Sequence, residues 1–556
     1  MKVSNTLTVL FCSLLFSALA SAANPRPNII FIITDDIGWT DWRVYNSEGL
    51  IPSPTIDKLA NEGIRFTDAH SSSALCAPSR YSLLTGNYPW RGLKPGGSWM
   101  WFKNPQILST QQTIGHVLQK AGYVTAIIGK LHIGGEFEWT ADRHIDFTQP
   151  MKVGPREWGF DYSFTLQAGH QSPPYLFFEN NRVYGDPTKI VDFPLIHSET
   201  GVTQQPGPGL PGWNPKKVAN QLLIKTQQFI NSTGEQPFYI HFSTPAAHWP
   251  YDSPDTLLGA RIAGKTGVSA RADMIYSVDV ILNKLLKTLR DSGKLNNTLI
   301  VLTSDNGGTN DDRPLGHDAN RGLLAEKSFI GEGGHRVPLI AWWPNHIPPG
   351  QVQSALVGTQ DMAATFAAIA GAPYVPTQLL DSIDLTPLLL GQQPAEKPLR
   401  DALLIDAGLG RDAFDTGQPT WQQQTDAHTD PAAWKRQFIR WVRNCHHRLF
   451  GKPQDRMLFD EEKADSDFWI NQADQGSNDG SQGMAHALRM GPWKLVFDIE
   501  HDAPVALYNL DHDLSEKTNL IDAPNQKTRI QTMEQRYREL RSSARSTPWG
   551  GNNNSP

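Results

Sequence analysis

Two continuous apolar runs, each followed by a pair of polar residues, constrain the fold of this chain more than any other feature. Residues 28–34 and 298–303 are rich in β-branched and aliphatic side chains, and Asp35-Asp36 and Asp305-Asn306 lie just beyond them. Such uninterrupted runs are typical of strands buried on both faces of a parallel sheet. Ligands of these sheets bind beyond the carboxyl ends of the strands, so the four polar side chains predict a site there.

Helical patterns separate further strand candidates along the first part of the chain. Strands are predicted at 123–128, 238–242 and 337–342, and helices at 54–60, 110–121, 272–289 and 362–370. This alternation indicates an α/β fold with a large, mostly parallel sheet sandwiched by helices. The Pro- and Gly-rich run 204–215 is expected to be a surface loop of this part.

The pattern changes after about residue 400. Residues 408–485 show weak periodicity, 488–497 is typical of a hairpin around Gly-Pro, 506–510 of a strand, and 528–541 of a closing amphipathic helix. We therefore expect a catalytic α/β domain at 23–400 and a smaller C-terminal α+β subdomain with antiparallel strands at 401–556.

Charge and cysteine content exclude two classes of protein. Lys+Arg 50 against Asp+Glu 56 gives a net charge of −6, which does not suit an electrostatic nucleic-acid partner. The chain has 3 Cys, and Cys12 lies in the first apolar stretch, so Cys76 and Cys445 alone cannot build a disulfide framework.

Residues 1–22 have the pattern of a signal peptide. Lys2 supplies the positive charge, 7–19 is apolar, and 20–22 is a small-residue cleavage site. The apolar run is too short for a retained membrane span. We expect an exported protein, periplasmic or secreted, with no membrane attachment once the signal is removed.

The four polar residues beyond the apolar runs form an all-oxygen set. Several carboxylates brought together repel one another unless a cation or a proton intervenes. Oxygen ligands favour a hard cation such as Ca²⁺ or Mg²⁺. Helix N-capping is the alternative for either pair taken alone.

A second distinctive segment runs from Cys76 to Gly86. Pro78 can occupy the first helical turn, which puts Cys76 just ahead of a helix N-terminus. From the residues alone, Cys76 is either a thiol nucleophile of lowered pKa or a small buried side chain.

The run Cys-x-Pro-Ser-Arg followed by Leu-Leu-Thr-Gly resembles the signature of the formylglycine-dependent (type I) sulfatases of the alkaline-phosphatase-like superfamily. Further stretches resemble family motifs in the same order: 28–36, 122–125 with 129–134, 245–250, 304–307, Lys327 with 332–338, 361–371, 381–384, 507–510 and 513–520. Leu131 replaces the usual Trp of the Gly-Lys-Trp-His-x-Gly motif.

The resemblance implies a nucleophile and a metal site. A maturation enzyme would oxidise Cys76 to Cα-formylglycine (3-oxoalanine), whose hydrate attacks the sulfur of a sulfate ester. Ser79 and Arg80 match positions that direct this modification, and Arg80 would also hold the modified side chain of residue 76 in place. The metal ligands carried over are Asp35, Asp36, Cys76, Asp305 and Asn306, for Ca²⁺ with Mg²⁺ as the alternative.

The resemblance also assigns charge and proton roles. Lys130 and Lys327 would face the sulfate oxygens, although spacing alone would make both ordinary surface lysines. His248 is the candidate general acid for the leaving oxygen, and His132 the candidate base for the second hydroxyl of the hydrate. Asp305 would accept the proton of the attacking hydroxyl.

Aromatic and basic residues suggest a carbohydrate substrate. Trp99 and Trp101 could stack on a sugar or pack internally. Further candidates for substrate contacts are Trp421, Trp434, Trp441, Trp469, Arg440, Arg443, Arg448, His317, His446 and His447, with a solvated charged face as the alternative for the arginines. We expect a bacterial enzyme acting on a sulfated poly- or oligosaccharide such as an algal galactan, a fucan or a glycosaminoglycan.

Two other functions compete with this interpretation. One is a phospho- or phosphonate-ester hydrolase of the same superfamily, although a phosphomonoester dianion usually attracts more metal charge than one site provides. The other is a non-catalytic carbohydrate-binding protein with a sulfatase fold that has lost its activity. A sulfotransferase would need a P-loop-like cradle, which the sequence lacks.

Overall fold

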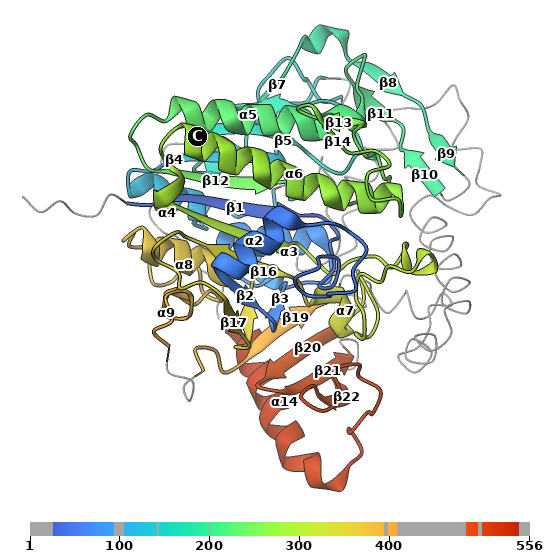
Figure 1. Cartoon of the computed structure of the whole chain (residues 1–556), viewed down its shortest axis with the longest axis vertical. Coiled ribbons are helices and arrows are strands. Elements are labelled where there is room, and N and C mark those ends of the chain that lie inside the picture. Colours follow the sequence, from blue (N-terminus) through green and yellow to red (C-terminus); the bar gives the residue numbers. More distant parts are fainter. Residues whose placement is uncertain are drawn as a thin grey trace, which may run out of the picture.

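A large mixed sheet forms the centre of the molecule (Figure 1). The structure is a computed structural model that describes residues 26–93, 105–141, 144–198, 201–393, 398–407, 485–498 and 503–543. In spatial order the ten strands are β17 (Gln351–Gln353), β2 (Ile64–Phe66), β16 (Leu339–Trp342), β15 (Thr298–Ser304), β1 (Asn28–Thr34), β12 (Phe238–Ser243), β4 (Val124–Lys130), β5 (Tyr162–Leu166), β6 (Phe178–Glu179) and β7 (Arg182–Val183).

The middle of this sheet is parallel, as predicted. β1 pairs in parallel with β15 on one side and β12 on the other, and β4 and β5 continue that direction. Thr34 lies opposite Ser304 in the β1–β15 register. The residues that follow β1 and β15 therefore leave the sheet side by side.

Every residue of β1 is buried, because helices cover both faces of the sheet. Ile29, Phe31 and Ile33 belong to one apolar core and the intervening isoleucines to the other. The first core includes residues of α3 (Cys76–Thr85), α4 (Ile114–Lys120), α8 (Asp361–Ile369) and α9 (Thr386–Leu389), and the second includes residues of α2 (Pro54–Glu62), α5 (Val218–Ser232) and α6 (Ala270–Asp291). The predicted sandwich of helices around a sheet is confirmed.

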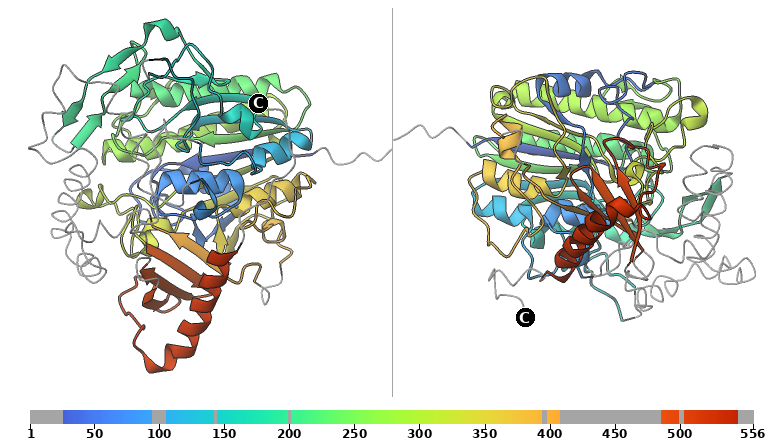
Figure 2. Two further views of the ribbon diagram at one scale, coloured as in Figure 1. Left: turned by 180° about the vertical axis from the view of Figure 1, so that it is seen from behind. Right: turned by 90° about the horizontal axis from the view of Figure 1, so that it is seen from below.

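A smaller antiparallel sheet lies at one end of the molecule, drawn in orange to red in Figures 1 and 2. Its strands in spatial order are β19 (Leu403–Asp406), β20 (Ala485–Met490), β21 (Trp493–Asp498) and β22 (Ala503–Asn509), and α14 (Lys527–Ser542) packs against it. Met533 and Tyr537 of α14 are buried in the core of this subdomain. The predicted hairpin and closing helix are both present.

Several details differ from the sequence prediction. α4 starts at Ile114 because Thr113 caps its N-terminus, its side chain accepting from the His116 N–H. The run predicted as a loop at 204–215 contains a strand, β11 (Gly207–Gly209), which pairs with β8 (Val191–Phe193). The other small ribbons are β9 (Ile196–Ser198) with β10 (Gly201–Gln204), β13 (Thr256–Leu257) with β14 (Ala260–Arg261) and β18 (Val357–Gly358) with β3 (Ala69–His70). The short helix α7 (Glu332–His335) follows Lys327.

None of the described helices is long and apolar enough to cross a membrane.

Gly129 is required where β4 meets β12. Its φ is +117°, and a Cβ atom there would lie 1.8 Å from the Ser243 carbonyl oxygen. Gly129→Ala is therefore expected to lower the free energy of unfolding by about 3 kcal/mol or more. Gly371→Ala is the control, since φ there is +60° with no atom within 4 Å; its cost should be about 1 kcal/mol. Denaturant unfolding of both variants measures the difference, and equal costs would contradict the steric argument.

Candidate active site

The polar residues that follow β1 and β15 meet in one buried cluster. The Asn306 side-chain amide donates to Asp36 Oδ1 at 2.8 Å, and the Asp36 N–H donates to Asp305 Oδ1 at 3.3 Å. Asp35 and Asp305 have no exposed surface, and Asp36 is 2% exposed. The parallel pairing of the two strands therefore brings three carboxylates and one amide together, as the sequence predicted.

Three cations face these carboxylates. Lys130 Nζ lies 2.5 Å from Asp35 Oδ2, and Lys327 Nζ lies 2.6 Å from Asp36 Oδ2. Arg80, on α3, contacts Asp305 through Nε at 2.9 Å. Lys130 is the last residue of β4 and is fully buried, so the alternative of a surface lysine is wrong for it.

The charges explain the protonation of the carboxylates. Burial alone would raise the pKa of Asp35, but Lys130, His248 and Arg80 outweigh it and hold that pKa well below its usual value. The pKa of Asp36 is lowered in the same way, against burial, by Lys327 and His248. Burial, with the charges of Asp35 and Asp36, raises the pKa of Asp305 despite the neighbouring Arg80.

Cys76 is the first residue of α3 and points toward His132. The distance from Cys76 Sγ to His132 Nδ1 is 3.2 Å, and Cys76 is 3% exposed. Burial raises the pKa of the thiol even though Lys130 and Lys327 lie nearby. An unmodified Cys76 is therefore protonated at neutral pH, which disfavours the reading as a thiolate nucleophile.

The two candidate acid–base histidines contact different members of this cluster, His132 contacting Cys76 and His248 approaching Asp36. His132 follows β4, and His248 lies beyond β12 with Nε2 at 3.9 Å from Asp36 Oδ2. Burial, with Lys327 and Lys130, lowers the pKa of His248 to about 4. Burial and Lys130 also lower the pKa of His132 well below its usual value, so both rings are neutral at pH 7 before an anion binds.

Backbone strain accompanies the site. Asp36, His132 and Ser328 have φ of 59°, 57° and 80°, a left-handed region that costs non-glycine residues free energy. Arg271 supports the first of them by donating from Nη2 to the Asp36 carbonyl oxygen at 3.2 Å. Such conformations persist where the surrounding structure imposes them, and two of these residues, Asp36 and His132, have their side chains in the cluster.

Comparison with known proteins identifies the family. The family model described as Sulfatase matches residues 27–372. The chain belongs to the sulfatase family. The resemblance read from the Cys76–Gly86 segment is therefore confirmed.

Named relatives of this sulfatase agree with the assignment. The N-acetylgalactosamine-6-O-sulfatase of Bacteroides thetaiotaomicron is 32% identical over 411 residues, covering 66% of this chain and 77% of that protein. Arylsulfatase A of Homo sapiens is 34% identical over 388 residues, covering 68% and 71%. The relatives are sulfatases, so the chain is an enzyme of the sulfuric ester hydrolases, as predicted.

A solved structure confirms the fold of this sulfatase. A Bacteroides thetaiotaomicron protein from the metabolism of multiple glycosaminoglycans matches with a TM-score of 0.70 at 23% identity, covering 93% of this chain and 100% of that one. At that identity the similarity establishes the α/β architecture and the C-terminal antiparallel sheet, and nothing about substrate.

The residues of the sulfatase site fit a hard divalent cation. Asp35 Oδ1 and Asn306 Oδ1 are buried without a hydrogen-bond partner among the described residues. Asp35, Asp305 and Cys76 each offer a ligand atom within 4.8 Å of the others. Unsatisfied buried oxygens are costly unless they bind something, and carboxylate and amide oxygens suit Ca²⁺ or Mg²⁺.

Most residues predicted for the sulfatase site lie together, and the others divide into two groups. His317 is not available to a substrate, because Nε2 lies 2.8 Å from Asp41 Oδ1 and Nδ1 accepts from the Leu50 N–H. The remaining candidates lie outside the described residues: Trp99, Trp101, Trp421, Trp434, Trp441, Trp469, Arg440, Arg443, Arg448, His446 and His447. The sequence did not predict Ser243 as a site residue; it lies at the end of β12, and its hydroxyl accepts a hydrogen bond from Arg80 Nη1.

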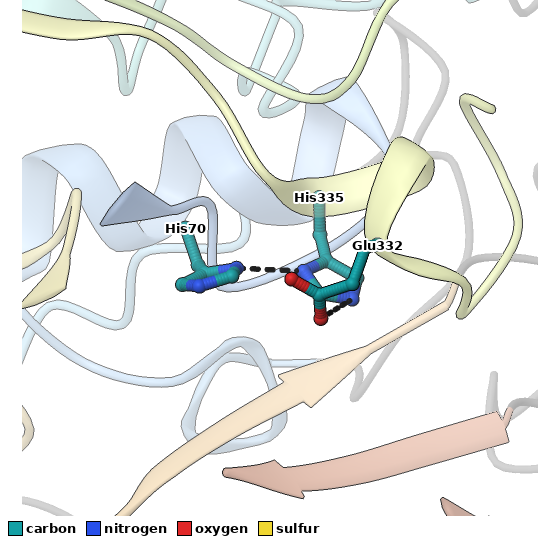
Figure 3. A group of neighbouring side chains, drawn as sticks. All are labelled: His70, Glu332 and His335. Carbon is teal, nitrogen blue, oxygen red and sulfur yellow. Dashed lines mark hydrogen bonds and ion pairs between the residues drawn. The ribbon is translucent and has the colours of Figure 1, made fainter. Parts of the chain in front are cut away.

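A second group of ligand-type side chains lies away from this site. Figure 3 shows His70, Glu332 and His335, all buried and within reach of one ion. His70 Nε2 lies 2.8 Å from Asp68 Oδ1, and His70 Nδ1 lies 2.9 Å from His335 Nδ1. If His70 donates to Asp68, then His335 donates to His70 and its Nε2 is an acceptor.

His335 Nε2 lies 3.1 Å from Lys494 Nζ, on β21 of the C-terminal sheet, and 3.1 Å from the Ile330 carbonyl oxygen. Lys494 also contacts Glu332 at 3.2 Å and Glu516 at 2.8 Å, and Arg489 of β20 contacts Asp68 at 2.9 Å. Both ring nitrogens of each histidine are thus used, and buried cations already balance Glu332. The group joins the C-terminal sheet to α7 and does not suit a metal ion.

Proposed function

We propose that this enzyme hydrolyses the sulfate ester of a sugar, with N-acetylgalactosamine 6-sulfate as the first candidate. One observation carries the proposal: three carboxylates, two lysines and an arginine are buried together beside Cys76, His132 and His248. The relatives named above as N-acetylgalactosamine-6-O-sulfatase and arylsulfatase A support sulfate as the group removed.

The charge of the site suits a sulfate monoester. Asp35, Asp36 and Asp305 are balanced by Lys130, Lys327 and Arg80. A bound Ca²⁺ held by Asp35, Asp36, Asp305 and Asn306 would leave two net positive charges for an anion. The monoanionic ester can then bind without a second metal ion, whereas a phosphomonoester dianion usually attracts more metal charge.

Matured Cys76, as formylglycine hydrate, would supply the attacking hydroxyl, and the cation would polarise a sulfate oxygen. Lys130 and Lys327 bind sulfate oxygens as point charges. Asp305 accepts the proton of the attacking hydroxyl. His248 would donate a proton to the sugar oxygen as its bond to sulfur breaks. His132 would then remove the proton of the second hydroxyl, so that the bond between the carbon of residue 76 and the sulfate oxygen breaks, sulfate leaves and the aldehyde re-forms.

Inorganic sulfate release, measured by ion chromatography, tests the proposal. The panel contains the 6-sulfates of N-acetylgalactosamine, galactose and N-acetylglucosamine, sulfated galactan and fucan, 4-nitrophenyl sulfate, and 4-nitrophenyl phosphate. Mass spectrometry first establishes that residue 76 is formylglycine. Release from one or more sugar sulfates supports the proposal. Phosphate release without sulfate release would favour the phosphoesterase alternative, and activity confined to 4-nitrophenyl sulfate would overturn the sugar assignment.

Removal of the cation is expected to lower both activity and thermal stability. Without it, Asp35 Oδ1 and Asn306 Oδ1 are left buried and unsatisfied. A ligand at 100 times its Kd stabilises the native state by about 2.7 kcal/mol, so dialysis against EDTA should lower Tm by several degrees. Calcium should restore Tm and sulfate release together, and full activity after EDTA would contradict the metal assignment. Restoration by Mg²⁺ alone would identify Mg²⁺ instead.

We also propose that residues 1–22 are removed on export to the periplasm or medium. The small residues at 20–22 and the apolar run before them support cleavage there. N-terminal sequencing of the exported protein tests this.

A further inference from the structure

The segment after β5 passes both acid–base histidines. The His132 N–H donates to the Gln167 carbonyl oxygen at 2.9 Å. A Cβ atom on Gly169 would lie 3.4 Å from His248 Nδ1, so the chain at Gly169 lies against the His248 ring. The next residue, His170, therefore directly follows the residue that contacts the Nδ1 edge of the His248 ring, whose Nε2 faces the carboxylate cluster.

His170 is buried and has no hydrogen-bond partner. It is 7% exposed, and among the described residues neither Nδ1 nor Nε2 makes a hydrogen bond. Native proteins rarely leave both nitrogens of a buried ring unsatisfied, since each costs about 1–3 kcal/mol. Such a ring is expected where a ligand supplies the missing partners.

Asp252 faces this ring across a gap. Its Oδ2 lies 3.7 Å from His170 Nδ1, which is longer than a hydrogen bond. A hydroxyl oxygen about 2.8 Å from each atom, to one side of the line that joins them, could contact both. The Asp252 side chain is 26% exposed against 5% for His170, so Asp252 forms the outer side of the gap and His170 the inner side.

Two amide oxygens add to the unsatisfied polar atoms beside His170. Gln171 Oε1 and Gln205 Oε1 are buried and make no hydrogen bond within the described structure. The backbone holds these residues together, since the Gln205 N–H donates to the Gln171 carbonyl oxygen at 2.8 Å and Tyr175 donates to both carbonyls. The polar atoms are therefore positioned by the fold and left open.

We propose that His170 and Asp252 bind hydroxyl groups of the sugar residue that carries the sulfate. A neutral imidazole both donates and accepts, a carboxylate accepts, and a sugar hydroxyl does both. An aryl sulfate offers no ring hydroxyl to this pair. The proposal rests on the function proposed above and adds that His170 selects sugar esters over simple aryl esters.

The experiment compares His170→Ala with the parent enzyme on two substrates. The kcat/KM for N-acetylgalactosamine 6-sulfate, or the best sugar sulfate of the panel, is expected to fall about 10- to 100-fold, mainly through KM. The kcat/KM for 4-nitrophenyl sulfate should change less than about twofold. His170→Gln, which keeps a donor and an acceptor, should recover most of the sugar activity.

Matched controls separate binding from folding. Ser172→Ala changes the same loop at a side chain that makes no hydrogen bond to any described residue, and it should leave activity on both substrates unaffected. In a double-mutant cycle, Asp252→Asn should cost less in the His170→Ala background than in the parent. Equal losses on both substrates, or no loss on the sugar, would overturn the proposal. If the parent cleaves only the aryl ester, the proposed sugar function itself has failed, and the subsite assignment fails with it.

Discussion

A Cys76→Ala enzyme is expected to lose sulfate release by at least about 10⁴-fold while keeping the parent fold. The side chain at this position would provide the nucleophile, and no other described side chain in the cluster can replace it, since the nearby carboxylates are paired with Lys130, Lys327 and Arg80. Alanine fits the buried space and removes the contact with His132 and one candidate ligand atom of the cation. Ion chromatography of sulfate and the thermal unfolding curve measure the two parts of this result.

Cys445→Ala is the matched thiol control, because that cysteine lies outside the Cys-x-Pro-Ser-Arg run. It should retain parental activity. Activity of Cys76→Ala above 1% of the parent would exclude residue 76 as the nucleophile. A loss of activity with a large fall in Tm would instead assign it a packing role.

A His248→Ala enzyme is expected to lose activity according to the leaving group. A sugar alkoxide needs a proton as it departs, so kcat on the sugar sulfate should fall about 10²- to 10⁴-fold. A 4-nitrophenolate ion leaves without that proton, so 4-nitrophenyl sulfate should lose less than about tenfold. The aryl ester is therefore an internal control for folding and for metal binding in the same variant.

The pH profile gives a second readout for His248. Its pKa is lowered to about 4 by burial and by Lys327 and Lys130. A general acid must carry its proton, and the protonated fraction falls as pH rises above that pKa. The kcat/KM for the sugar sulfate should therefore fall with rising pH, and His248→Ala should remove this dependence. Equal losses on both esters with an unchanged profile would show that His248 is not the general acid.

The sequence predicted the centre of the site because local pattern and topology both point to it. Residues 28–34 and 298–303 are apolar enough to be buried on both faces, and parallel neighbours must end at the same edge. Asp36 and Asp305 therefore meet although they are far apart in the chain. The family motif then supplied Lys130 and Lys327, which no periodicity would have selected.

Other parts of the molecule carry no comparable pattern. β11 was missed because its Gly-Pro-Gly sequence is typical of loops, and its partner β8 is only three residues, Val-Asp-Phe, too short for an alternating pattern to appear. The contact of Lys494 with His335 spans 159 residues and joins the C-terminal sheet to α7, so the sequence near one residue gives no indication of the other. His170 is a single histidine in a loop, and only its unsatisfied ring nitrogens make it a candidate.

The junction of β19 and β20 has a consequence for how such enzymes diversify. Asp406 pairs with His486, and the Ala407 N–H donates to the Ala485 carbonyl oxygen at 2.8 Å. β19 and β20 therefore stay paired up to the point where residues 408–484 leave the sheet and return to it. Closure entropy grows only slowly with the length of a connection, so this link can be shortened, extended or exchanged without altering strand register. Evolution or an engineer can therefore graft a different connection here as a separate module, while Cys76 and the cation ligands stay in place.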